Sequence, residues 1–144
     1  MSDLLFVYGT LLPEAAPEAM RAVIRRCHRG GRGGAATVSG ALHDLGSYPG
    51  LSIERDGVVR GELVTVNSPS VWLRLDAYEG FNSAHPDRSL FRRQLCVATR
   101  IEDGEQLEAW AYVYNRDVRH APRIDCGCWL THMGNQGDVT VVAV

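Results

Sequence analysis

The stretch LLFVYGTL, residues 4–11, is the part of the chain around which the remaining motifs are organised. Its first five residues are apolar or aromatic, which is typical of a short strand buried on both faces, and Gly9 ends the run. A strand that stops at Gly-Thr leaves backbone N–H groups unpaired at the rim of a sheet, where glycine lets a ligand oxygen approach closely. The stretch therefore predicts either an oxygen-binding strand end or an ordinary tight turn.

Length and composition favour one ordinary domain without a nucleic-acid partner. The 144 residues are long enough to bury a core, and we expect a single domain over 1–144. The 15 basic and 17 acidic side chains give a formal charge of -2, which argues against a nucleic-acid surface. Every basic residue is arginine, so Schiff-base catalysis by a lysine is excluded.

The chain shows no sign of a membrane segment or of a disulfide framework. No apolar run approaches the roughly 20 residues that a membrane span needs, and Asp3 stands where a signal peptide carries positive charge. We therefore expect a cytoplasmic protein with no membrane partner. The cysteines are few and unevenly spaced, so free thiols are expected at Cys27, Cys96, Cys126 and Cys128. The sequence does not predict an oligomeric state.

A first surface helix is expected over residues 17–29. Met20, Val23, Ile24 and Cys27 recur at helical spacing, with glutamates early and arginines late, as the helix dipole prefers. The RGGRGG segment at 29–34 allows a phosphate or RNA contact, but we interpret it as a helix end followed by a flexible loop.

Beyond residue 35 the pattern changes to short strands separated by glycine turns. We expect one strand over 37–45, a turn over 46–50, and a hairpin that pairs 51–54 with 58–66 through the Asp-Gly turn between them.

Glycines inside the predicted strands indicate that the sheet is bent. Gly40 and Gly61 both lie within strand patterns, where glycine suggests a bend or bulge. Repeated bends help a sheet to curl and close, so we predict a small barrel in preference to a flat sheet.

A second helix is predicted between Ser68 and Gly80. Ser68 suits the N-cap, Pro69 suits the first helical position, and Gly80 suits the C-terminal end.

The last turn of this second helix carries the candidate base, Glu79. Trp72, Leu75 and Glu79 are spaced by three and four residues, so they share one face of the helix. A carboxylate on a buried face at a helix C-terminus is disfavoured by desolvation and by the dipole, and both raise its pKa toward the range of a general base. The alternative is that the helix frays and Glu79 reaches solvent.

Two later strands complete the predicted sheet. Over 90–101 the odd positions Phe91, Leu95, Val97 and Ile101 are expected to form an apolar face, with Arg93 among them. We expect Arg93 either to pair with an acid of a pocket, to contact substrate, or to lie at an open strand end.

In the last of these strands, 109–114, alanines and Val113 alternate with aromatic residues. Tyr114 is chosen as a cavity-lining residue because it lies at the strand end.

No metal site is predicted. The histidines show no helical pair at ligand spacing, and Cys126 and Cys128 are separated by a single residue, which is closer than the usual zinc-ligand spacing. The sequence also contains no Gly-x-Ser-x-Gly elbow and no phosphate loop.

The motifs taken together resemble those of the gamma-glutamylcyclotransferase-like family. The resemblance rests on the following segments in this order: FVYGTL at 6–11, GALHDLGSYPG at 40–50, VRGEL at 59–63, LDAYEG at 75–80 and SLFRR at 89–93. Each motif is short, and their combination carries the likeness. Family members usually have tyrosine where this chain has Phe91, so any hydrogen bond of that hydroxyl is lost here.

The resemblance implies a fold, a site and a reaction. The implied fold is α+β, a small bent mixed β-barrel with flanking helices and a cavity at its mouth. The implied site places Tyr8, Gly9, Thr10 and Leu11 around a glutamyl group and makes Glu79 the catalytic acid/base. The implied reaction converts a small-molecule gamma-glutamyl amine or peptide to 5-oxoproline and a free amine, with no metal or cofactor.

Two other functions remain open at this stage. The same pocket also suits a binding module that holds a small metabolite without turnover. A protein-interaction domain is the other alternative, and it predicts an exposed apolar patch.

Overall fold

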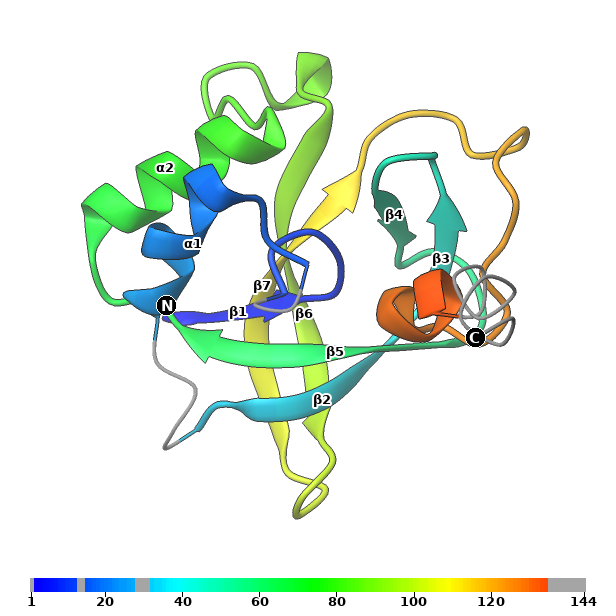
Figure 1. The fold of residues 1–144 in the computed structure, drawn as a ribbon, viewed down its shortest axis with the longest axis horizontal. Helices are drawn as coiled ribbons and strands as arrows, with labels where there is room; N and C mark the ends of the chain where they lie inside the picture. The colour runs from blue at the N-terminus through cyan, green and yellow to red at the C-terminus, as the bar shows by residue number, and fades with distance from the viewer. Residues whose placement is uncertain (1, 13–14, 28–31, 135–144) are drawn as a thin grey trace, which may run out of the picture.

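A five-stranded sheet closes on itself and forms the body of the molecule. The computed structural model describes residues 2–12, 15–27 and 32–134. Its sheet has the strand order β1-β5-β2-β6-β7 and closes through a parallel contact between β7 and β1 (Figure 1). The elements are β1 (Leu4–Val7), α1 (Glu18–Arg25), β2 (Gly34–Ser39), β3 (Ala41–Asp44), β4 (Pro49–Ser52), β5 (Val58–Thr65), α2 (Pro69–Glu79), η1 (Pro86–Arg88), β6 (Phe91–Arg100) and β7 (Gln106–Tyr114). The predicted α+β class and small mixed barrel are confirmed.

Strand β1 is buried on both faces, as its composition predicts. It pairs antiparallel with β5 and parallel with β7, so both of its edges are satisfied. Alternate side chains enter two separate cores. The core inside the sheet, here called the barrel core, includes Leu4, Phe6, Tyr8, Val38, Leu42, Leu51, Val59, Leu63, Ala98, Ala111 and Trp129. The core under the helices, here called the helix-side core, includes Leu5, Val7, Leu11, Met20, Val23, Ile24, Val64, Val71, Leu75, Phe91 and Tyr112.

Both main helices lie on one side of the barrel, next to each other (Figure 1). Helix α1 buries Met20, Val23 and Ile24, the stripe that its spacing predicts. It ends at Arg25, earlier than the expected end at 29, and residues 28–31 of the expected glycine-rich loop lie outside the described residues. No helix in the described part of the chain combines the length and the apolar character that crossing a membrane requires.

The predicted pairing of 51–54 with 58–66 is wrong. Strand β4 pairs with β3 in a separate two-stranded sheet, while β5 pairs with β2 and β1 in the barrel. The expected strand over 37–45 is also broken in two at Gly40, whose φ of 152° turns the chain out of the barrel. A hydrogen bond of 3.0 Å from the Gly40 N–H to the Gly57 carbonyl joins the two ends of this excursion. The β3–β4 hairpin is thus an insertion between two paired barrel strands.

The expected apolar face of the sixth strand is only partly correct. Phe91 is buried, but Leu95, Val97 and Ile101 are 38%, 58% and 46% exposed. The odd positions of β6 face the outside of the barrel, where the helices cover only the beginning of this long strand. Ala98, on the opposite face, enters the barrel core.

Strands β1 and β5, which pair antiparallel, approach each other closely at Gly61. A Cβ at Gly61 would lie 2.3 Å from the Val7 carbonyl oxygen and 2.8 Å from the Phe6 ring. Both neighbours belong to the fully buried first strand, so neither can move away without disturbing a core.

We predict that Gly61→Ala lowers the free energy of unfolding by about 2–3 kcal/mol, because the added methyl group overpacks the contact between β5 and β1. Urea denaturation measures the loss. Gly134→Ala is the matched control, since nothing lies within 4 Å of that position. Equal stabilities of the two variants would contradict the prediction.

Candidate active site

Helix α2 ends where the sequence predicts and places Glu79 at its last residue. Pro69 occupies the first turn, and Gly80 adopts the left-handed conformation with φ 69°, which ends the helix. The Gly80 carbonyl accepts a hydrogen bond of 3.1 Å from the Leu90 N–H, so the helix end is tied to the segment that begins β6. The Glu79 backbone is therefore held on both sides of the turn.

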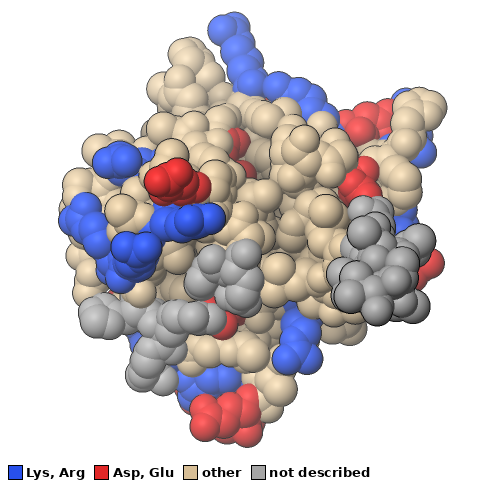
Figure 2. Space-filling view, in the orientation of Figure 1, with Lys and Arg blue, Asp and Glu red and all other residues tan. Residues whose placement is uncertain are grey.

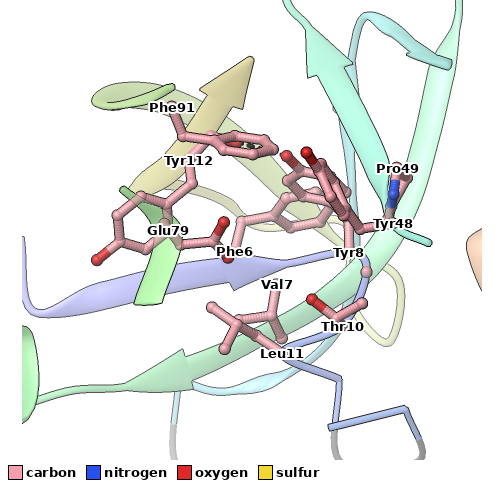
Figure 3. Close-up of a pocket in the computed structure, with 11 residues that line it drawn as sticks. Phe6, Val7, Tyr8, Thr10, Leu11, Tyr48, Pro49, Glu79, Phe91 and Tyr112 are labelled. Atoms are coloured by element: carbon pink, nitrogen blue, oxygen red, sulfur yellow. Dashed lines mark hydrogen bonds between the residues drawn. The ribbon is translucent and has the colours of Figure 1, made fainter. Parts of the chain in front are cut away.

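Glu79 lines a small inner pocket together with the loop that follows β1 (Figure 3). The pocket has a volume of about 20 Å³, which is room for roughly one water molecule. Its lining consists of Phe6, Val7, Tyr8, Gly9, Thr10, Leu11, Tyr48, Pro49, Glu79, Phe91 and Tyr112. The structure thus brings together the segments 6–11 and 75–80, which are far apart in the sequence.

Burial changes the acidity of Glu79. Desolvation raises the pKa of its carboxyl group from 4.5 to about 8. The Glu79 side chain forms neither a hydrogen bond nor an ion pair with any part of the chain that the structure describes. The group therefore holds its proton at neutral pH and becomes a base as the pH approaches 8.

The loop from Gly9 to Leu12 presents unpaired backbone donors beside this carboxyl group. The Leu12 N–H donates to the Gly9 carbonyl at 2.9 Å and closes a tight turn. Within residues 2–12, 15–27 and 32–134, the N–H groups of Gly9, Thr10 and Leu11 have no acceptor. They are available to bind a ligand oxygen.

Gly9 is required by packing as well as by access. A Cβ at this position would lie 2.6 Å from Cγ of Pro49, which also lines the inner pocket. The β3–β4 insertion therefore packs directly against the loop that follows β1.

The Tyr8 hydroxyl group is occupied by the fold. It donates to the Tyr112 carbonyl at 2.5 Å and accepts a bond of 3.3 Å from the Leu51 N–H. Burial, with a smaller contribution from the negative charge of Glu79, raises the Tyr8 pKa well above its ordinary value. Tyr8 thus contributes its ring to the pocket wall, while its hydroxyl group joins β7 to β4.

An outer pocket of about 210 Å³ adjoins the inner one. The two share Thr10, Tyr48, Glu79 and Phe91. Tyr78 and Leu90 complete the outer wall, and the Tyr78 hydroxyl donates to Oγ1 of Thr10 at 2.9 Å. This bond connects α2 to the loop at the entrance.

Arg93 forms an ion pair with an acid, as one alternative predicts, but this acid, Asp76, lines neither the inner nor the outer pocket. Its Nε lies 3.7 Å from Oδ1 of Asp76, and the Tyr112 hydroxyl donates to the same oxygen at 2.6 Å. The guanidinium group also lies 4.6 Å from the ring centre of Trp72 and 5.2 Å from that of Trp110. Asp76 lies one turn before Glu79, so this cluster fixes α2 against the barrel.

The structure places Tyr114 outside the inner and outer pockets. Its ring packs against Phe91, with ring centres 5.3 Å apart, and it lines a different groove. Tyr112, two residues earlier on the same face of β7, lines the inner pocket instead. Sequence reasoning also passed over Tyr48 and Pro49 as site residues, although the segment 40–50 belongs to the motif set.

The described residues contain no group of three histidine, cysteine, aspartate or glutamate side chains that could hold a metal ion. The four cysteines are free; Cys126 lies in a turn and Cys128 directly before the helical residues that begin at 129.

The chain is similar to one protein family over most of its length. The family profile described as "Gamma-glutamyl cyclotransferase, AIG2-like" matches residues 5–131. No curated protein is significantly similar in sequence.

Several solved structures share the fold. YkqA from Bacillus subtilis has 21% identity and a TM-score of 0.71, and the match covers 96% of this chain but only 43% of YkqA. An AIG2-like protein (GGACT) from Mus musculus has 20% identity and a TM-score of 0.57, with 80% and 79% of the two chains covered. The protein ytfP from Escherichia coli has 26% identity and a TM-score of 0.55, with 90% and 98% covered.

We predict that Glu79→Gln changes how stability depends on pH. Below pH 4.5 the Glu79 carboxyl group keeps its proton in both the folded and the unfolded state. Between pH 4.5 and about 8 only the unfolded chain releases this proton, so the wild type loses stability as the pH rises. The loss can reach about 5 kcal/mol, since one pKa unit corresponds to ~1.4 kcal/mol. The glutamine variant lacks this dependence.

Denaturant unfolding of both proteins at pH 4, 6 and 8 would measure the effect. Glu108→Gln, at an exposed position on β7, is the control and should follow the wild type at every pH. A stability difference between wild type and Glu79→Gln that stays constant with pH would show that Glu79 is a solvated acid.

We also predict that Arg93→Met lowers the free energy of unfolding by roughly 2–4 kcal/mol, because Asp76 loses its ion-pair partner at a site where its side chain is only 14% exposed. Thermal or urea unfolding measures the change. Arg74→Met removes an exposed arginine from α2, the helix that carries Asp76, and should change stability by less than about 0.5 kcal/mol. A small effect at both positions would refute an anchoring role for Arg93.

Proposed function

Because this chain belongs to the gamma-glutamyl cyclotransferase, AIG2-like family, we propose that it converts a gamma-glutamyl amine or peptide to 5-oxoproline and a free amine. The observation that carries the proposal is the desolvated carboxyl group of Glu79, which shares a pocket with the unpaired N–H groups of the loop 9–11. An acid/base and a set of oxyanion donors are the two components that intramolecular acyl transfer requires.

In the proposed reaction the substrate attacks itself. The α-amino nitrogen forms a bond to the γ-carbonyl carbon, and the bond from that carbon to the amine nitrogen then breaks. Glu79 carries a proton from the α-ammonium group to the departing nitrogen, and the second proton that the ring nitrogen must lose also ends on the departing nitrogen, which leaves as an ammonium ion, so no net proton is gained or lost. Acyl transfer of this kind needs no redox cofactor.

The loop amides are assigned to the charge that develops on the γ-carbonyl oxygen. Donors that are already fixed in position stabilise such a charge without reorganisation during the reaction. Gly9, Thr10 and Leu11 are held by the turn to Leu12 and by packing against Pro49, which supports this assignment.

The inner pocket is too small to hold the substrate as it stands. Its volume of about 20 Å³ has room for roughly one water molecule, so binding of the glutamyl group requires movement of the side chains around the pocket. Holding the nucleophile against the electrophile supplies rate by itself, an effect of up to ~7–11 kcal/mol in the best cases.

We predict that Glu79→Gln reduces 5-oxoproline release by about a hundredfold or more, because the amide keeps the shape of the carboxyl group and loses its acid/base function. The wild-type rate should increase with pH up to about 8, as the carboxyl group ionises. The measurement is 5-oxoproline release from a panel of gamma-glutamyl amides and dipeptides, followed from pH 5 to pH 9, with Glu108→Gln as the control.

Binding of these compounds without any 5-oxoproline release would favour the alternative, a module that holds a gamma-glutamyl metabolite without turnover. A fully active Glu79→Gln variant would refute the assigned role of Glu79 while leaving the reaction itself in place.

A further inference from the structure

We propose that a polar groove between the β3–β4 insertion and the strands β6 and β7 binds a small molecule that carries a phosphate group, such as a nucleoside or sugar monophosphate. The groove has a volume of about 510 Å³, which is typical of small-molecule sites. It is lined by residues 52–55 and 113–118 and by Arg92 and Gln94. None of these residues lines the inner or the outer pocket, so this second site does not depend on the proposed reaction.

The alternation of β6 directs two consecutive arginines to opposite faces of the strand. Arg93 faces the helices, where Asp76 pairs with it, whereas Arg92 lines the groove. The Arg92 side chain is exposed and forms neither a hydrogen bond nor an ion pair with any residue in the described ranges. Arg92 therefore presents an unoccupied guanidinium group to the groove.

Arg55 adds a second unoccupied guanidinium group from the β3–β4 insertion. It lies in the segment between β4 and β5, is exposed, and makes no side-chain hydrogen bond or ion pair within the part of the chain that the structure describes. A planar guanidinium group can donate to two phosphate oxygens at once. Arg55 and Arg92 thus offer this contact from two different elements of the groove wall.

Arg116 supplies a third positive charge, and its position is fixed by the fold. Its Nη1 donates to the Ser89 carbonyl at 2.8 Å, and its Nη2 donates to the Arg88 carbonyl at 3.0 Å. These carbonyl groups carry no formal charge, and no acid of the described residues pairs with Arg116. The guanidinium charge is therefore held in the groove wall without being neutralised.

The acids of the groove do not balance this charge. Asp117 is already paired with Arg119, at 2.6 Å between Oδ2 and Nη2. Glu54 is the remaining acid of the lining, and it is exposed and without a basic partner in the described ranges. Three arginines thus share the groove with one unpaired acid, so the groove is locally positive although the whole chain has a formal charge of -2.

A phosphate monoester suits this groove better than a carboxylate or a nucleic-acid strand. It carries about 1.5 to 2 negative charges at neutral pH, whereas a carboxylate carries one. Ser52, Gln94 and the Tyr114 ring supply polar and aromatic contacts for the rest of a small ligand. A nucleic-acid strand needs an extended basic surface, but Figure 2 shows acidic side chains beside arginines around a largely uncharged middle on the face in view.

The test is an NMR titration of the isotope-labelled protein with adenosine monophosphate (AMP). We expect the amide signals of residues 52–55 and 113–118 to shift with a Kd below about 1 mM at about 50 mM NaCl, and binding to weaken as the NaCl concentration rises. Adenosine, which lacks the phosphate, should bind at least about tenfold more weakly than AMP. Ribose 5-phosphate and inorganic phosphate are titrated in parallel, to separate a nucleotide from a sugar phosphate and from the free ion.

Arg92→Gln and Arg55→Gln should each weaken AMP binding by about tenfold, because each removes one guanidinium group from the phosphate. Glu54→Gln should strengthen AMP binding by about twofold or more, because it removes the unpaired negative charge. All three side chains are exposed, so the variants should keep the fold. Arg74→Gln removes an exposed arginine that does not line the groove, and it should keep the wild-type Kd.

Each part of the proposal has a result that would overturn it. Equal affinities for AMP and adenosine would remove the role of the phosphate, and unchanged AMP affinity in both Arg92→Gln and Arg55→Gln would remove the role of the arginines. Shifts confined to the loop 9–11 would place AMP in the inner pocket instead. Inorganic phosphate that binds as tightly as AMP and ribose 5-phosphate would show a site for the ion alone. A single-stranded RNA oligonucleotide that binds more tightly than AMP would replace the small molecule with a nucleic acid.

Discussion

The double burial of β1 is the constraint on which the rest of the structure depends. Leu4, Phe6 and Tyr8 belong to the barrel core, while Leu5 and Val7 belong to the helix-side core, so one four-residue strand and its first following residue connect both. Because both edges of β1 are also paired, the residues that follow β1 must continue over the rim of the barrel. The unpaired amides at the rim follow from that geometry, and so does the position of the pocket.

The candidate site combines a desolvated acid with a rigid support. The α2 end carries Glu79 without a partner in the described region, which is costly, whereas Asp76 one turn earlier has both Arg93 and Tyr112 as partners. The stabilising ion pair and hydrogen bond are thus formed by Asp76, and the neighbouring Glu79 side chain takes no part in them. Such a division is expected where a site must keep a group in an unfavourable environment for chemistry.

Sequence patterns within a few residues were sufficient to predict most local features, but they did not predict which distant strands pair. The Ser68 and Gly80 helix ends and the bend at Gly40 depend on local backbone preferences and are confirmed. The β4 partner was predicted wrongly, because the turn at Asp56-Gly57 suits a hairpin while the competing β2–β5 pairing is decided by distant residues. Tyr114 was chosen as a cavity-lining residue from its position at the strand end; it lines a groove separate from the inner pocket, which Tyr112 lines instead. Alternation along a strand shows which residues share a face, but it does not show which part of that face the neighbouring elements cover.

The parallel contact between β1 and β7 has a consequence for biosynthesis. Leu5 pairs with Trp110, so β1 leaves the ribosome long before the strand that satisfies its second edge has been synthesised. Closure of so distant a contact makes folding slow and leaves an apolar strand edge exposed in the nascent chain. Until β7 has been synthesised, that edge is a point at which chaperones can bind or two unfinished chains can associate.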